Sequence, residues 1–361
     1  MDRRKLLKVA GATAVAGAVS APAIAQSAPA IKWRLTTTFP KTLDTLYGAC
    51  DLFAKTVGEL SDQKFQISVY GPGEIVPPFQ VFDAVANNTV EMGNTASYYY
   101  IGKDLAFAFG TAVPFGLNTR QMNSWLAYGG GLDLLNELYG TFGMMAIPFG
   151  NTTAQMGGWF RKEIKTVDDL SGLKFRVGGM AGMVLSKLGV VPQQLPPGDI
   201  YPSLEKGTID AAEWIGPYDD EKLGFLKVAP YYYYPGWWEG CANGFLYINV
   251  AKWNELPKTY QSMITAACAQ AAGDLTAKYD AYNARSIKRL VANGAQLRPF
   301  SAEILDASYK ATTELYAEIG AKNERFKKLH DSMMAFRTEQ YQWDQVCEAT
   351  YDNYLIRRIR G

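Results

Sequence analysis

Two hydrophobic periods alternate along residues 31–96. Apolar and polar residues alternate in 31–39 and again in 65–71, which is the period of a half-buried strand. Between these stretches, apolar residues from Leu43 to Val57 recur every three or four positions, as they do on one face of a helix. A further helical stretch follows, and 90–96 again has the pattern of a strand. This β-α-β-α-β order predicts the start of a doubly wound parallel sheet, whose ligand-binding edge lies at the C-terminal ends of the strands.

The alternation of strand and helix patterns begins again in the middle of the chain. A helix is expected over residues 119–139 and a strand over 143–151. Residues 173–179 form the next predicted strand and are followed by a helix. A further helical stretch turns into a strand at 209–215. This repetition of the β/α pattern indicates a second α/β lobe.

The last third of the chain is mostly helical. Residues 245–256 alternate as a strand does, and almost everything after 259 has helical spacing, with a break near 294–300. We therefore expect an α/β protein with two lobes joined by crossing strands and with long C-terminal helices. The expected division is lobe I at 26–153, lobe II at 154–245, and a crossing strand with C-terminal helices at 246–361.

The first 25 residues form a predicted export signal. They begin with charged residues, continue with a stretch rich in alanine, valine and glycine, and end at Ala23-Ile24-Ala25, which has the pattern of a cleavage site. The pair Arg3-Arg4 resembles the start of a twin-arginine signal. The apolar stretch is too short to span a membrane. We expect a protein that is exported by the twin-arginine route into a bacterial periplasm.

Composition argues against several classes of function. The formal net charge is +1, and no basic patch is interleaved with aromatic residues, so nucleic acid is not an expected partner. His330 is the only histidine, which argues against a histidine-dependent triad and against a multi-histidine metal site. The four cysteines lack the CxxC spacing of zinc sites, and we expect them to be unpaired and mostly buried.

Polar residues in aromatic or glycine-rich surroundings are the candidate binding groups. Gln155 begins the segment QMGGWFR, Arg176 ends the strand-like GLKFR, and Glu213-Trp214 follows GTIDAA. Glu239 follows four tyrosines and two tryptophans in APYYYYPGWWEG. Taken singly, each of these residues except Glu239 has an ordinary structural explanation, such as a surface charge or a core ring.

Charge balance gives these residues a joint meaning if they meet in space. Arginine pairs with a carboxylate through two parallel hydrogen bonds. A site holding Arg176, Glu213, Glu239 and a carboxylate ligand would contain one positive and three negative groups, and it would repel its ligand in a low-dielectric pocket. Either one glutamate is protonated, or a metal cation bridges the acids and the ligand. The available donors are oxygen atoms, which suit a hard cation.

On these segments the chain resembles the substrate-binding proteins of tripartite ATP-independent periplasmic (TRAP) transporters. The resemblance covers essentially the whole mature chain and is most specific in GLKFRVGG, LEKGTIDAAEWIGPYDDEKLGF and APYYYYPGWWEG. The last two segments are similar to the branch that binds 2-oxo acids such as pyruvate, and to its lactate-binding relatives. The resemblance implies two α/β lobes that close on the ligand like a flytrap, and delivery of the ligand to TRAP membrane subunits.

The resemblance also implies roles for individual residues. Arg176 would pair with the ligand carboxylate, and a metal ion would be held by the side chains of Gln155, Glu213 and Glu239 and by the main-chain carbonyl of Trp214. The ion would be sodium in the keto-acid type and calcium in the lactate type. Charge balance favours calcium, whereas the YYYYPGWWEG segment favours sodium. We expect sodium, because a glutamate with a raised pKa would account for the difference in charge.

Two further expectations concern tyrosines and the C-terminus. The segment SYYYIGKD follows the third predicted strand, so Tyr99 or Tyr100 would donate a hydrogen bond to the ligand; stacked core tyrosines are the alternative. Residues 335–359 are helical and rich in aromatics, and the resemblance implies a homodimer formed through this segment. A helix folded back on its own lobe is the alternative.

We expect a solute-binding subunit that captures a short 2-oxo monocarboxylate without covalent chemistry. A 2-oxo or 2-hydroxy acid can chelate a metal through its carboxylate and the adjacent oxygen. Three alternatives stay open. They are lactate binding with calcium, a metal-dependent lyase or hydrolase that uses Glu213 and Glu239 as its acid–base pair, and a sensor that passes its ligand to a receptor.

Overall fold

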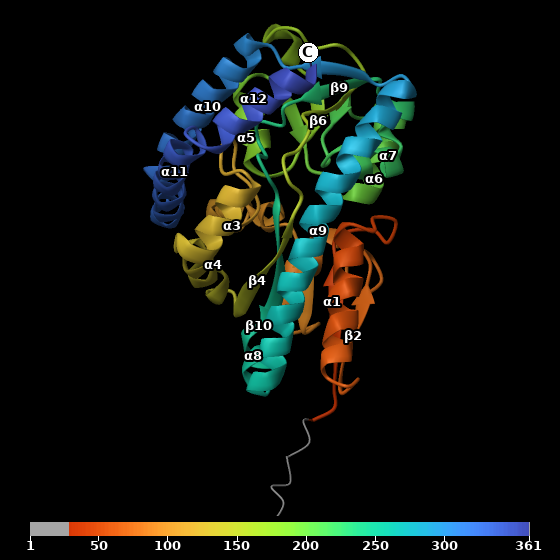
Figure 1. Ribbon diagram of the computed structural model, residues 1–361, viewed down its shortest axis with the longest axis vertical. Helices are drawn as coiled ribbons and strands as arrows, with labels where there is room; N and C mark the ends of the chain where they lie inside the picture. The colour runs from red at the N-terminus through yellow and green to blue at the C-terminus, as the bar shows by residue number, and fades with distance from the viewer. Residues whose placement is uncertain (1–28, 361) are drawn as a thin grey trace, which may run out of the picture. The chain divides into compact units, whose positions relative to one another are not determined.

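The first of two sheets is built from the N-terminal part of the chain and one later strand. The computed structural model describes residues 29–360 (Figure 1). The strands of this sheet are β1 (Ile31–Thr37), β2 (Phe65–Tyr70), β3 (Met92–Thr95), β4 (Met144–Asn151) and β10 (Asn243–Asn249), in the order β2-β1-β3-β10-β4. β1 pairs in parallel with β2 and β3, which confirms the predicted parallel start, and β10 lies antiparallel between β3 and β4. The chain therefore crosses back into its first sheet.

Helices on the first sheet follow the apolar spacing of the sequence. In α1 (Leu46–Leu60) the residues at that spacing, including Cys50, Phe53 and Val57, are fully buried. α1 packs against the long α9 (Lys258–Ala292), which also contacts β4 and, further along, α7 (Pro217–Leu223) (Figure 1). The other helical segments here are η1 (Pro78–Gln80), α2 (Val81–Ala86), η2 (Ser97–Tyr100), η3 (Leu105–Gly110), α3 (Thr119–Tyr128), α4 (Gly131–Gly140) and α8 (Val250–Glu255).

The single helix predicted for residues 119–139 is two helices. α3 ends at Tyr128 and α4 begins at Gly131, and Gly130 between them has a φ of 76°. Glycine adopts this left-handed conformation without the steric cost of a side chain. The apolar spacing continues on both sides of the break, so hydrophobic periodicity alone did not reveal it.

The second sheet is formed by the middle of the chain and one late strand. Its strands are β5 (Gly158–Phe160), β6 (Lys174–Arg176), β7 (Val191–Gln193), β8 (Ala211–Ala212), β9 (Tyr231–Tyr234) and β11 (Gln296–Pro299), in the order β11-β9-β5-β8-β6-β7. The connecting helical segments are η4 (Asp168–Leu170), α5 (Gly179–Lys187), α6 (Pro197–Glu205) and η5 (Phe225–Lys227). The strand predicted at 209–215 is only two residues long, so the chain leaves the sheet at Glu213.

Three helices complete the chain and confirm the expected α/β class with long C-terminal helices. They are α10 (Ala302–Gly320), α11 (Glu324–Asp344) and α12 (Glu348–Arg360). Residues 345–347 divide the segment 335–359 into two helices, and Asp344 accepts a hydrogen bond of 3.0 Å from Gln121 Nε2 of α3.

All four cysteines are unpaired, and three of them are buried. None of the helices in residues 29–360 is both long enough and apolar enough to cross a membrane.

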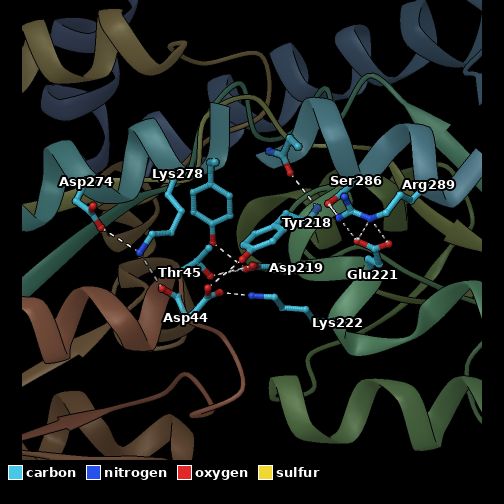
Figure 2. Close-up of polar contacts among 12 residues, drawn as sticks. Asp44, Thr45, Tyr218, Asp219, Glu221, Lys222, Asp274, Lys278, Ser286 and Arg289 are labelled. Atoms are coloured by element: carbon cyan, nitrogen blue, oxygen red, sulfur yellow. Dashed lines mark hydrogen bonds and ion pairs between the residues drawn. The ribbon is translucent and has the colours of Figure 1, made fainter. Parts of the chain in front are cut away.

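A buried polar cluster joins α7 to the start of α1 and to α9 (Figure 2). Asp219 of α7 is fully buried and accepts hydrogen bonds from the Thr45 hydroxyl, at 2.8 and 3.0 Å, and from the Tyr279 hydroxyl, at 2.8 Å. Next to it, Asp44 forms an ion pair with Lys222 of α7. The cluster holds the first turn of α1 against the helix that follows β8 in the second sheet.

Buried carboxyl groups in this region make stability depend on pH. Burial raises the pKa of Asp219 to about 6 and that of the adjacent Asp220 to about 7. An aspartate in an unfolded chain has a pKa of about 3.9. At these two carboxyls the folded protein therefore binds more protons than the unfolded chain between pH 4 and pH 7, and their contribution to stability falls as the pH rises through this range.

We predict that Asp220→Asn flattens this pH dependence. Asp220 Oδ2 accepts hydrogen bonds from Trp159 Nε1 at 2.9 Å and from the Tyr232 hydroxyl at 2.7 Å, and an asparagine oxygen can accept both without ionising. Between pH 4 and pH 7 the wild type should lose on the order of 2–4 kcal/mol more stability than the variant. Urea unfolding at a series of pH values measures this difference. Asp331→Asn, at an exposed carboxyl, is the control and should keep the wild-type slope; the same slope in Asp220→Asn would contradict the prediction.

Candidate functional site

Arg176 is the last residue of β6 and is almost fully buried. Its Nη1 donates to the main-chain oxygen of Glu213 at 2.7 Å and pairs with the Glu213 carboxylate, and its Nε donates to the Leu195 carbonyl at 3.2 Å. Nη2 has no hydrogen-bond partner among the described residues. Leaving a buried charged donor unpaired is unfavourable. Arg176 therefore has one nitrogen available to an anionic ligand.

Glu213 lies beside Arg176 because their strands pair. β6 and β8 are parallel neighbours with Arg176 opposite Ala212, which brings the next residue of the chain, Glu213, to the end of both strands. Oε1 pairs with Arg176 and also accepts a hydrogen bond of 3.2 Å from the Gly178 N–H, whereas Oε2 has no partner in the described chain. Burial raises the pKa of Glu213 even though Arg176 opposes it.

The turn between β9 and β10 brings Glu239 to Gln155. The Gln155 N–H donates to the Glu239 carbonyl at 3.2 Å, and the Gly236 N–H donates to the Gln155 carbonyl at 3.0 Å. A Cβ at residue 236 would lie 2.8 Å from that carbonyl oxygen, so this close approach requires glycine. Glu239 is buried, and burial followed by repulsion from Glu213 raises its pKa well above the usual value.

Tyr98 and Tyr99 extend from η2 toward these groups. The Tyr98 hydroxyl is near enough to Glu239 to lower the pKa of that carboxyl, although neither carboxylate oxygen accepts a hydrogen bond of ordinary geometry. Tyr99 lies beside Arg176; burial raises the pKa of Tyr99 to about 12, and the guanidinium opposes this rise. Both rings therefore approach the charged groups from the first sheet.

Tyr100 lies elsewhere. Its hydroxyl accepts a hydrogen bond of 3.1 Å from the Phe82 N–H and lies 3.3 Å from Thr95 Oγ1, in the core of the first sheet. Sequence reasoning named Tyr99 and Tyr100, whereas the structure brings Tyr98 and Tyr99 to the site. Consecutive residues of a 3₁₀ helix point about 120° apart, so three tyrosines in a row cannot share one direction. The three consecutive tyrosines indicated the region of the site, but not which of their rings face it.

Gly178 and Gly179 make room for Tyr98. A Cβ at either glycine would lie within 2.9 Å of the tyrosine ring, and Gly179 has a φ of 59°. The glycine-rich segment after Arg176 thus allows a ring to approach the backbone closely. This packing accounts for the two glycines.

A small cavity lies next to the charged groups. The cavity has a volume of about 40 Å³. Among the described residues, no charged side chain lines the cavity. The lining comes from the first sheet and its flanking segments, from α9 and from the loop after β8: Phe39, Leu46, Asn94, Thr95, Ala96, Tyr98, Tyr99, Thr111, Phe149, Gly150, Thr152, Gln155, Trp214, Ile215, Ala242, Asn243, Gly244 and Leu275. The Trp214 ring centroid is 5.3 Å from Arg176 Cζ. The guanidinium therefore lies directly behind the cavity wall.

The unpaired oxygens of this site fit a hard cation. Gln155 Oε1, Glu213 Oε2 and both carboxylate oxygens of Glu239 are buried and accept no hydrogen bond from residues 29–360. Oxygen donors of this kind suit sodium or calcium, and a cation would offset the burial of two acids. Within the described chain, no three His, Cys, Asp or Glu side chains group as a metal site, so this set depends on one amide and two carboxylates.

Comparison with known proteins shows which family the chain belongs to. The family model described as bacterial extracellular solute-binding protein, family 7, matches residues 37–323. A relative from Nostoc sp. strain PCC 7120, described as a monocarboxylate 2-oxoacid-binding periplasmic protein, is 46% identical over 360 residues, which cover 98% of this chain and 99% of the relative.

Two solved structures of TRAP solute-binding proteins resemble the chain closely. One, from Bordetella bronchiseptica, is 51% identical with a TM-score of 0.90, covers 92% of this chain and 99% of its own, and is described as a mixed-occupancy dimer with calcium and picolinate in the active site. Another, from Pseudoalteromonas atlantica, is 37% identical with a TM-score of 0.87, covers 89% of this chain and 98% of its own, and contains sodium and pyruvate. The chain therefore belongs to the family 7 (DctP) extracellular solute-binding proteins, the periplasmic binding components of TRAP transporters.

Proposed function

We propose that this protein captures a short 2-oxo monocarboxylate, such as pyruvate, together with a metal cation, and delivers it to TRAP membrane subunits. One guanidinium nitrogen and four carboxylate and amide oxygens are buried without hydrogen-bond partners among the described residues, and Gln155 of this group lines a small cavity together with Trp214. This observation carries the proposal. The nitrogen suits an anion and the oxygens suit a cation. The ligands named for the similar proteins, pyruvate and other monocarboxylates, agree with this chemistry.

The chain's own residues divide the binding task. Arg176 Nη2 would hold the ligand carboxylate, and Tyr99 beside it would supply a hydroxyl. Gln155, Glu213, Glu239 and the Trp214 carbonyl would hold the cation, which when bound supplies positive charge to the carboxylate and the adjacent oxygen of the acid. We expect sodium, with calcium as the alternative, because similar proteins contain one or the other.

The cavity favours a monocarboxylate of small size. A second carboxylate on the ligand would lie against the uncharged lining and have no cation to pair with, which is strongly unfavourable. The space of about 40 Å³ leaves room for a short tail only. Dicarboxylates and sugar acids are therefore expected to bind poorly.

The proposed cycle contains no covalent step. The lobes, with boundaries near residues 153 and 245, would close on ligand and cation and reopen at the membrane subunits, because the closed state binds more tightly. The predicted twin-arginine signal lies in residues 1–25, outside the described residues, and the route of export stays a prediction.

Isothermal titration tests the proposal. Mature protein, residues 26–361, is titrated with pyruvate and with L-lactate after chelation, and again with sodium or calcium restored. We expect pyruvate to bind only when a cation is present. Absence of binding for either acid with either ion would overturn the 2-oxo-acid proposal, and conversion of either acid to a product would show an enzyme instead.

We further propose that the protein is a homodimer formed through its C-terminal helices. Large apolar side chains are exposed along α11 and α12, namely Tyr341, Trp343, Val346, Tyr351, Tyr354, Ile356 and Ile359. A concentration of exposed apolar residues is typical of an interface. The similar protein from Bordetella bronchiseptica is described as a dimer, which supports the proposal.

The double variant Trp343→Glu, Tyr354→Glu should shift the protein from dimer to monomer. Two charges in an apolar contact would have to be desolvated without partners. Sedimentation velocity measures the change. Tyr128→Glu, at a side chain that is 94% exposed on α3, is the matched control and should stay dimeric. A wild-type monomer, or an unchanged dimer in the double variant, would contradict the proposed interface.

A further inference from the structure

We infer that Leu275, on α9, limits the length of the acid that the cavity accepts, together with Leu46 of α1. This inference rests on the proposed function and adds to it the residues that select the ligand's tail. The charged and polar groups that would hold the carboxylate and the cation are Arg176, Gln155 and the residues after β8. Three apolar side chains of the lining, Leu46, Phe149 and Leu275, come from other elements.

An apolar part of the cavity wall comes from α1, β4 and α9. Leu46 begins α1, Phe149 and Gly150 lie near the end of β4, and Leu275 belongs to α9. Phe149 is held edge-on against Phe53 of α1, with ring centroids 5.5 Å apart. The aliphatic side chains of Leu46 and Leu275 are therefore the parts of this wall whose size can be changed with the least disturbance of aromatic packing.

Leu275 lies tightly against the backbone of β4. A Cβ built on Gly150 would be 2.6 Å from Leu275 Cδ2, and Gly150 has a φ of 127°, so the strand has no side chain here and the leucine takes its place. Nearby on α9, Thr276 Oγ1 lies 3.5 Å from the Asn151 carbonyl. The position of Leu275 is thus determined by packing of α9 on β4.

Leu46 is also held in place by buried contacts. Leu46 follows Thr45, whose hydroxyl is hydrogen-bonded to the buried Asp219 of α7. α9 packs against α1, β4 and α7 together, so it touches helices of both sheets. A longer acid cannot displace Leu46 or Leu275 without breaking these buried contacts, so we expect the two side chains to limit the length of the tail.

The test is a titration series in a saturating concentration of the cation that supports binding. Pyruvate, 2-oxobutanoate, 2-oxopentanoate and 4-methyl-2-oxopentanoate are compared on wild type, Leu275→Ala and Leu290→Ala. Leu290 is the matched control, because it lies on the same helix, is equally buried at 3% exposure, and does not line the cavity. Each additional buried methylene strengthens binding about fourfold.

We expect Leu275→Ala to raise the affinity of 2-oxopentanoate relative to pyruvate by about tenfold over wild type, and Leu290→Ala to leave this ratio unchanged. Leu275→Val, a smaller change, should move the ratio in the same direction and serves if the alanine variant does not fold. If wild type binds pyruvate and the ratio is the same in all variants, the inference is overturned and the proposed function stands. If wild type binds none of the acids, the proposed function fails and the inference with it.

Discussion

Arg176→Ala should abolish binding of the carboxylate ligand and also destabilise the protein. The ligand carboxylate loses the guanidinium that would pair with it, and removing one partner of a buried charge pair typically weakens binding by about 2–5 kcal/mol. In the free protein, Glu213 loses the guanidinium that pairs with it at full burial. Breaking a buried pair in this way costs about 3–5 kcal/mol of stability. Titration calorimetry and urea unfolding measure the two effects.

Two further variants separate the effects on binding and on folding. Arg176→Lys keeps the positive charge but cannot present the planar fork of arginine, so it should retain more stability than the alanine variant and still bind the acid poorly. Arg34→Ala removes a 44% exposed side chain that pairs with Glu91, and it should change stability by no more than about 1 kcal/mol and leave binding intact. Wild-type affinity in Arg176→Ala would show that the ligand carboxylate binds elsewhere.

Glu239→Gln should stabilise the cation-free protein while it removes cation-dependent ligand binding. Glu239 is buried, its two carboxylate oxygens have no hydrogen-bond partner within residues 29–360, and Glu213 repels it. A neutral amide removes the cost of burying this charge, about 1–3 kcal/mol. The same change takes a negative charge from the proposed cation site. Opposite effects on stability and function are typical of residues that are kept for binding.

The pH dependence gives this prediction a second readout. The pKa of Glu239 is raised in the folded state by burial and then by Glu213, so cation-free wild type should lose stability as the pH rises above the usual range of a glutamate. The Glu239→Gln variant should lose less stability over the same rise in pH. The control is Glu163→Gln. The Glu163 carboxylate pairs with Arg298 and Lys165, so replacing it with a neutral amide should not stabilise the protein. A destabilised Glu239→Gln variant that still binds pyruvate with a cation would contradict the assignment of Glu239.

Local sequence patterns were sufficient for several elements of the first sheet, but the strand predicted over 245–256 is wrong beyond Asn249, where α8 begins. The alternating and helical periods predicted β1, α1, β2 and β4 to within a few residues, because each of these elements buries one regular face. The patterns were insufficient where a strand is very short or a glycine interrupts a helix, as at β8 and Gly130. In such places the structure depends on pairing with a distant strand or on one backbone angle. Neither of these produces a hydrophobic period in the sequence.

The sequence by itself determined the α/β class, the C-terminal helices and the family, since repeated local patterns and three specific segments carry that information. It also singled out Arg176, Glu213 and Glu239 as unusual charges. Only the tertiary structure decided how these charges are arranged. Arg176 and Glu213 meet through the pairing of β6 with β8, and Glu239 reaches Gln155 through a turn.

The tertiary structure also decided which neighbours surround the site. Tyr98 rather than Tyr100 approaches Glu239, because the 3₁₀ turn of η2 rotates the two rings in different directions. Leu275 reaches the cavity from a helix that begins more than 100 residues after β4 ends. Contacts between elements this far apart in sequence depend on strand order and helix packing, which local periodicity does not encode.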